Sequence, residues 1–90
     1  MGKVSSFQLD GITCWFYSNE HKPPHFHAKR KGQWHITVEF LRPKSQMINR
    51  AKGPQGRIKK TDRDAMLDMA ELYREELLKE WEQKAQTDDN

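Results

Sequence analysis

The sequence predicts an α+β fold, in which a small antiparallel sheet of about four strands packs on one long C-terminal helix. Short runs rich in aromatic and β-branched residues, separated by Gly and Pro, fill the first half of the chain. The last third instead repeats apolar residues at helical spacing. A chain of 90 residues is long enough for one domain with a thin core. We therefore expect a single domain over residues 1–84 and a disordered tail over residues 85–90.

The first predicted element is a β-hairpin around Asp10-Gly11, a dipeptide typical of two-residue hairpin turns. Residues 7–9 form its first strand and residues 12–17 its second. Both faces of the second strand carry apolar side chains, which predicts a strand in the interior of the sheet. Cys14, the only cysteine, belongs to this strand, and we expect it in the core.

Two further strands, residues 25–31 and 34–41, are predicted on either side of Gly32. The length of the turn decides which face the histidines share, because a shift of one residue moves every side chain to the other face. A two-residue turn would bury imidazoles and a lysine among apolar side chains, which costs free energy. A three-residue turn over 31–33 avoids this cost and predicts the pairs His25–Glu39, His27–Thr37 and Lys29–His35.

The last predicted element is a helix over residues 62–84 with Thr61 as its N-cap. Apolar residues recur there every three or four positions, which is typical of a helix that packs one face on a sheet. These positions are Met66, Met69, Ala70, Tyr73, Leu77 and Trp81.

Basic residues are concentrated before this helix. Residues 1–60 hold 12 Lys or Arg and three Asp or Glu, whereas residues 61–90 hold four and ten, so charges of +9 and −6 make up the net +3. The basic segment, residues 42–60, is expected to be a loop without any acid, and its bases are Arg42, Lys44, Arg50, Lys52, Arg57, Lys59 and Lys60. Such a loop suits nucleic-acid binding, because each neutralised phosphate releases counterions. A solvated loop, or one that docks on the chain's own acidic helix, stays open as an alternative.

All four histidines lie within 15 positions of one another. The candidate catalytic residues are Glu20, His21, His25 and His27. Imidazoles titrate near neutral pH, so one histidine can remove a proton while a second donates one. Lys29 and Arg30 follow directly and are expected to stabilise the negative charge of a phosphate.

Two alternatives use the same residues. Side chains two positions apart on a strand lie about 6.6 Å apart on one face. At this spacing His25 and His27 can hold one metal ion, with Glu39 or His21 as a third ligand. In the other alternative the histidines only shape a polar, solvent-facing surface of a binding module without catalysis. Our preferred interpretation uses no metal and no cofactor.

Several classes of protein are disfavoured. No apolar run approaches the ~20 residues of a membrane helix, so we expect no membrane contact. The single cysteine fits a reducing compartment, and the first residues do not resemble a signal peptide. These features lead us to expect a cytoplasmic protein.

The stretch that begins at Tyr17 and contains Glu-His-Lys-Pro-Pro-His-Phe-His resembles a small bacterial family, the domain of unknown function 4160. The resemblance covers residues 12–81 and includes a helix that ends at Trp81. The basic segment departs from it, since members usually have a short connection of mixed charge there. The residues that match the signature are Glu20, His21, Pro23, Pro24, His25 and His27.

Some members of that family are described as the toxin of a type II toxin–antitoxin module. The resemblance therefore implies a toxin-like protein with a cognate small antitoxin-like partner. Together with the histidines and the basic residues, it leads us to expect action on nucleic acid, with RNA favoured, by a metal-independent ribonuclease. The alternatives are a non-enzymatic module that binds nucleic acid or the partner, and a histidine metal site.

Overall fold

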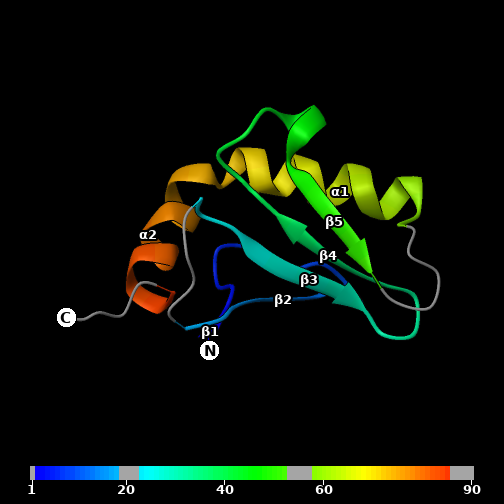
Figure 1. Ribbon diagram of the computed structural model, residues 1–90, viewed down its shortest axis with the longest axis horizontal. Coiled ribbons are helices and arrows are strands. Elements are labelled where there is room, and N and C mark those ends of the chain that lie inside the picture. Colours follow the sequence, from blue (N-terminus) through cyan, green and yellow to red (C-terminus); the bar gives the residue numbers. More distant parts are fainter. Residues whose placement is uncertain (1, 19–22, 53–57, 86–90) are drawn as a thin grey trace.

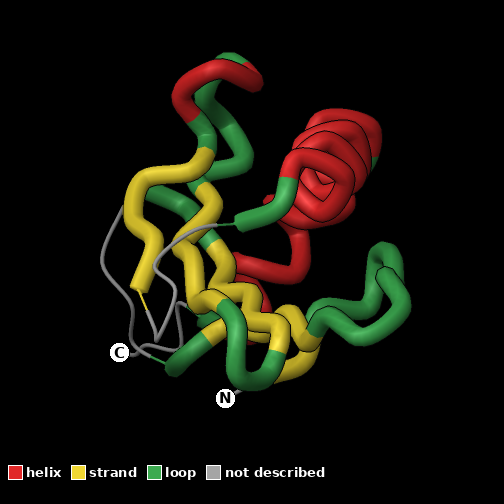
Figure 2. The backbone as a smooth tube through the Cα atoms, turned by 90° about the vertical axis from the view of Figure 1, so that its right-hand side faces the viewer, coloured by secondary structure: helices red, strands yellow, loops and turns green. Residues whose placement is uncertain are grey.

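The computed structural model describes residues 2–18, 23–52 and 58–85, with the side chains of 49–52 left aside. It has the expected α+β architecture, in which two C-terminal helices cover one face of an antiparallel sheet (Figure 1). Figure 2 shows the helices lying to one side of the strands. None of the described helices is long and apolar enough to cross a membrane.

The sheet has five strands in the order β1-β2-β3-β4-β5, so each strand pairs with its neighbours in the sequence. All four pairings are antiparallel. β2 lies between β1 and β3, which confirms that it is an interior strand. The strands are β1 (Gly2–Lys3), β2 (Thr13–Phe16), β3 (Phe26–Arg30), β4 (Trp34–Val38) and β5 (Ile48–Lys52).

The first hairpin differs from its prediction. The turn at Gly11 forms, with a φ of 74° and a hydrogen bond of 3.1 Å from the Ile12 N–H to the Leu9 carbonyl. Residues 7–9, however, make only one bridge, between Leu9 and Ile12, and the predicted first strand is wrong. β1 takes its place at the edge of the sheet, with Gly2 opposite Phe16. The chain between β1 and β2 leaves the sheet because a carboxylate on the second helix binds the backbone of this segment.

That carboxylate belongs to Glu80. It accepts hydrogen bonds from the backbone N–H groups of Ser5, at 2.8 Å, and Ser6, at 2.7 Å, and from the Ser6 hydroxyl. Lys84 donates a further bond of 2.7 Å. Burial alone would raise the pKa of Glu80, but the bonds from Lys84, Ser6 and Ser5 together hold it below its ordinary value. Glu80 thereby fastens the N-terminal arm to the second helix.

The turn between β3 and β4 has the three-residue length that the sequence predicts. Gly32 has a φ of 76°, which favours glycine, and the Gln33 N–H donates to the Arg30 carbonyl at 2.9 Å. The pairs Phe26–Val38, His27–Thr37 and Lys29–His35 confirm the predicted register. The expected pair His25–Glu39 lies beyond the last paired residues.

The basic segment is not simply a loop. It contains a short 3₁₀ helix, η1 (Lys44–Gln46), and the edge strand β5, which pairs with β4 across an irregularity between Thr37 and Val38. The first helix begins at its last residue, Lys60. The sequence of β5 has no strong alternation of apolar and polar residues, and the strand was therefore not predicted. An edge strand is held by main-chain pairing with one neighbour, here β4.

The single predicted helix is divided in two, α1 (Lys60–Leu72) and α2 (Arg74–Lys84). Tyr73 interrupts it with φ −102° and ψ 22°. No Gly or Pro lies there; instead Arg74 donates to the carbonyls of Phe40, at 2.8 Å, and Arg42, at 3.0 Å. These bonds hold the break against the loop after β4. The predicted N-cap is also wrong, because Lys59 occupies that position and no side chain caps the helix.

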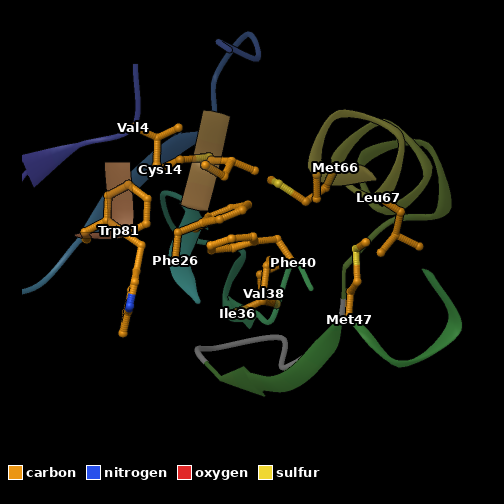
Figure 3. Close-up of a cluster of buried hydrophobic side chains, with 14 of the residues drawn as sticks. Val4, Cys14, Phe26, Ile36, Val38, Phe40, Met47, Met66, Leu67 and Trp81 are labelled. Carbon is orange, nitrogen blue, oxygen red and sulfur yellow. The ribbon is translucent and has the colours of Figure 1, made fainter. Parts of the chain in front are cut away.

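The core lies between the helices and the inner face of the sheet. Figure 3 shows Met66 of α1 pointing toward Phe26 and Phe40. Cys14 is buried there, and burial raises the pKa of its thiol to about 12, so it stays protonated as a core residue. Ala85, which the sequence assigns to the tail, is buried, and residues 86–90 lie outside the described part of the chain.

We predict that Glu80→Gln lowers the free energy of unfolding by about 1–3 kcal/mol, because it deprives Lys84 and the serine donors of a buried carboxylate. Urea denaturation measures this change. Glu82→Gln, at an exposed position on the same helix, is the matched control and should change stability by less than about 0.5 kcal/mol. Equal stability of the two variants would contradict the assigned role of Glu80.

The lowered pKa of Glu80 also predicts a dependence on pH. A carboxyl whose pKa is lower in the folded than in the unfolded protein adds stability above its unfolded value and loses it as pH falls through its folded value. The stability difference between the wild type and Glu80→Gln should therefore shrink between neutral pH and about pH 3. Urea midpoints at the two pH values test this, and a constant difference would refute it.

Candidate nucleic-acid interface

The face of the sheet that points away from the helices carries the candidate site, and we call it the outer face. Side chains alternate along each strand, so the residues between the core positions collect here. Its described members are Lys3, Thr13, Trp15, Tyr17, His27, Lys29, His35 and Thr37. No acidic residue is among these eight, and the outer face is therefore suited to negatively charged ligands.

The pairing arranges these residues in two rows across the strands. One row runs from Lys3 through Trp15 and His27 to Thr37. The next runs from Thr13 through Lys29 to His35. Residues of one row are direct neighbours on one face. In β5, the Cα atoms of Arg50 and Lys52 pair with those of Thr37 and His35.

Trp15 is the centre of a packed aromatic layer. His27 stacks on its ring at 5.6 Å with an interplanar angle of 23°, and His35 lies at 5.3 Å. Tyr17 approaches edge-on at 5.8 Å, and the Lys29 ammonium lies 5.8 Å from the centre of the indole. Trp15 is consequently only 8% exposed, whereas Tyr17 is 41% exposed. This part of the outer face is thus a partly buried layer of aromatic rings, and not the polar, solvent-facing surface of the binding-module alternative.

His25 and His27 lie close together, with ring centres 5.1 Å apart. Nδ1 of His25 lies 2.8 Å from the carbonyl oxygen of Pro23. A carbonyl only accepts, so this nitrogen carries the hydrogen, and Nε2 is the basic nitrogen of the neutral ring. The His25 ring also lies 5.2 Å from Trp81 in the core. The first histidine therefore has a fixed tautomer and orientation.

The other two candidate catalytic residues, Glu20 and His21, lie outside the described residues, as does Arg57 of the basic segment. In the described part of the chain, no group of three or more His, Cys, Asp or Glu side chains is arranged to hold a metal ion. Glu39, the expected third ligand, is buried and accepts a hydrogen bond from Arg42. The proposed ligands His25, His27 and Glu39 are not brought together as a metal site.

Lys29 and Arg30 lie on opposite faces of the sheet. Lys29 is exposed on the outer face, as a phosphate contact requires. Arg30 instead forms two bonds of 2.9 Å to the Asp62 carboxylate in the first turn of α1. Hydrogen bonding by Arg30 is the main reason why the pKa of Asp62 lies below its usual value. The predicted phosphate contact of Arg30 is therefore replaced by a structural ion pair between β3 and α1.

Several cations of the basic segment are paired with the chain's own acids. Lys44 lies 2.7 Å from Asp68 and 3.5 Å from Glu71, both on α1. Lys60 lies 2.8 Å from Asp64, and Arg42 binds Glu39. Lys59 is exposed at the start of α1. For Lys44, the alternative that the segment docks on the acidic helix is confirmed.

A groove of about 370 Å³ lies on the outer face and is lined by Lys3, Thr13, Trp15, Tyr17 and Lys29. Lys3 is a site residue that the sequence does not predict, because β1 is not predicted either. A strand of two residues carries no periodicity, and no other pattern in the sequence marks this lysine. The cations that line this groove are Lys3 and Lys29.

Comparison with curated proteins and with solved structures found no match. A family model described as Domain of unknown function (DUF4160) matches residues 11–82. The matched region includes β2, β3, β4 and α1, and with them both outer-face histidines. The match covers most of the 90 residues, and the chain belongs to the DUF4160 family.

Proposed function

We propose that this protein acts on RNA as the toxin-like component of a two-gene module, with His25 and His27 as a metal-independent acid/base pair. The observation that carries the proposal is the distance of 5.1 Å between the two imidazole rings. His27 shares the outer face with the exposed Lys29, and none of the eight residues named above for that face is acidic. Imidazole pairs and cations are the groups that phosphodiester cleavage needs when no metal takes part.

The proposed reaction is an attack within the RNA chain. Nε2 of His25 takes the proton of a ribose 2′-hydroxyl, whose oxygen forms a bond to the adjacent phosphorus. The bond from phosphorus to the 5′-oxygen of the next nucleotide breaks, and His27 gives that oxygen a proton. The products are a cyclic phosphate and a free 5′-hydroxyl. Lys29 stabilises the negative charge that builds on the phosphate oxygens in the transition state.

The same proposal includes a partner protein and a cytoplasmic location. The family resemblance supports a cognate small antitoxin-like protein as partner. RNA as target and a protonated, buried Cys14 fit a cytoplasmic protein. A neighbouring gene for a small acidic protein would support this arrangement.

A non-enzymatic binding module is the second candidate. The bond of His25 to Pro23 and its contact with Trp81 suit a residue that shapes the loop before β3. In that case the aromatic layer and the lysines hold RNA without cleaving it. The two candidates differ in whether RNA is cut.

We predict that His25→Asn/His27→Phe folds and binds RNA but cleaves it about 10²–10⁴-fold more slowly. Asn retains a donor for the Pro23 carbonyl, and Phe retains the ring contacts of His27 with Trp15. Neither replacement can transfer a proton near neutral pH. The measurements are thermal melting and cleavage of labelled RNA in the presence of a chelator.

His35→Phe is the matched control, because it replaces another ring of the same layer and should leave cleavage unchanged. Undiminished cleavage by the double variant would refute the acid/base pair. RNA binding without cleavage by the wild type would select the binding module. His25→Ala/His27→Ala is a poorer test, since it also removes ring contacts that stabilise the fold.

We propose that the bases of the basic segment contribute to RNA affinity by different amounts. Replacing Arg50 and Lys52 with Ala should lower the slope of log binding constant against log salt by about 0.7 per residue, the value for a lost phosphate contact on a single strand. Replacing Lys44 and Lys60 should lower it less, because their ammonium groups bind Asp68 and Asp64. Equal effects of the two pairs, in titrations with RNA, would count against this division.

A further inference from the structure

The groove on the outer face has the size and lining of a site for one small polar-aromatic ligand. Its volume of about 370 Å³ lies near the lower end of the range for small-molecule sites. It forms where β1, β2 and β3 lie side by side, since Lys3 pairs with Trp15 and Thr13 pairs with Lys29. All five lining residues belong to the described part of the chain.

Tyr17 gives the groove an accessible aromatic wall. Tyr17 is 41% exposed, although its ring centre lies 4.6 Å from that of His27 and 5.8 Å from that of Trp15. These edge-on contacts hold the ring in place without covering it. A fixed and exposed ring is the usual platform on which an unpaired base stacks, and every base has a suitable face.

Two lysines place positive charge at the groove. Lys3 and Lys29 are both exposed, and no acidic residue lines the groove with them. The Lys29 ammonium now lies over the indole of Trp15. Its long side chain can turn from the ring to a phosphate at little cost, because it is flexible and exposed.

Trp15 adds a third feature. Its indole N–H is buried and has no hydrogen-bond partner among the described residues. Buried donors of this kind are rare, because an unmade hydrogen bond costs free energy. This donor lies in the plane of the indole, so it takes no part in holding a ligand above the ring face, where the Lys29 ammonium lies.

We infer that this groove binds one unpaired nucleotide of a single-stranded RNA, with the base against Tyr17 and the adjacent phosphate held by Lys3 and Lys29. The inference rests on the proposed function, because a strand that leaves the groove past Tyr17 meets His27 directly. Bases within a duplex are stacked and paired, so they cannot offer a face to Tyr17. The substrate class is therefore single-stranded RNA.

The test uses a short oligoadenylate, the same strand in a duplex, and adenosine monophosphate as probes, with binding measured by titration at two salt concentrations. Tyr17→Ala should weaken binding of the oligoadenylate by about 5- to 100-fold, whereas Tyr17→Phe should bind like the wild type. Lys3→Ala/Lys29→Ala should lower the salt slope by about 1.4, the value for two lost phosphate contacts. Arg63→Ala/Lys79→Ala, on exposed positions of the helices, is the charge-matched control.

The outcomes separate the groove from the proposed cleavage. If the groove variants bind the oligoadenylate as tightly as the wild type, the groove assignment is wrong, while cleavage by the histidine pair stands. If binding depends on the groove but the wild type cuts no RNA, the groove assignment holds and the proposed cleavage fails. Preference for the duplex would also overturn the single-strand assignment, and so would binding of adenosine monophosphate that does not depend on Tyr17.

Discussion

The three-residue turn between β3 and β4 determines which side chains meet the helices and which form the outer face. Gly32, with its φ of 76°, allows the chain to reverse so that Phe26 pairs with Val38. A slip of one residue would exchange the two faces along the whole strand. His27 would then lie among the core side chains, and the aromatic residues of the core would lie in water. Both the core and the candidate site thus depend on one turn.

A second constraint acts on the edge of the sheet. Glu80 binds the backbone of Ser5 and Ser6, and the adjacent Lys84 donates to the Lys3 carbonyl at 2.8 Å. These bonds place β1 beside β2, although a strand of two residues has little intrinsic stability. This attachment, together with the pairing of Lys3 with Trp15, holds Lys3 at the groove. A carboxylate on the second helix therefore helps to build a surface on the opposite side of the sheet.

The sequence predicted those parts of the fold that local pattern determines. Alternation and turn length identified β2, β3 and β4 and their register, and the periodicity of the last third identified the helical region. The missed features arise from contacts between distant residues. β1 depends on Glu80, β5 is an edge strand with little apolar alternation, and the break at Tyr73 is held by bonds from Arg74 to carbonyls after β4. For the same reason the sequence did not predict that His27 and His35 pack on Trp15.

These features make the outer face, rather than the basic segment, the centre of the functional account. Its aromatic layer, its histidines and its lysines come from β1, β2, β3 and β4, on the side of the sheet opposite the helices. The most direct measurement is an NMR titration of the protein with single-stranded RNA, followed through the backbone and indole N–H signals. We expect shifts at Lys3, Trp15, Tyr17 and His27, with little change along α1. Shifts confined to α1 or to the basic segment, with the outer face unchanged, would contradict it.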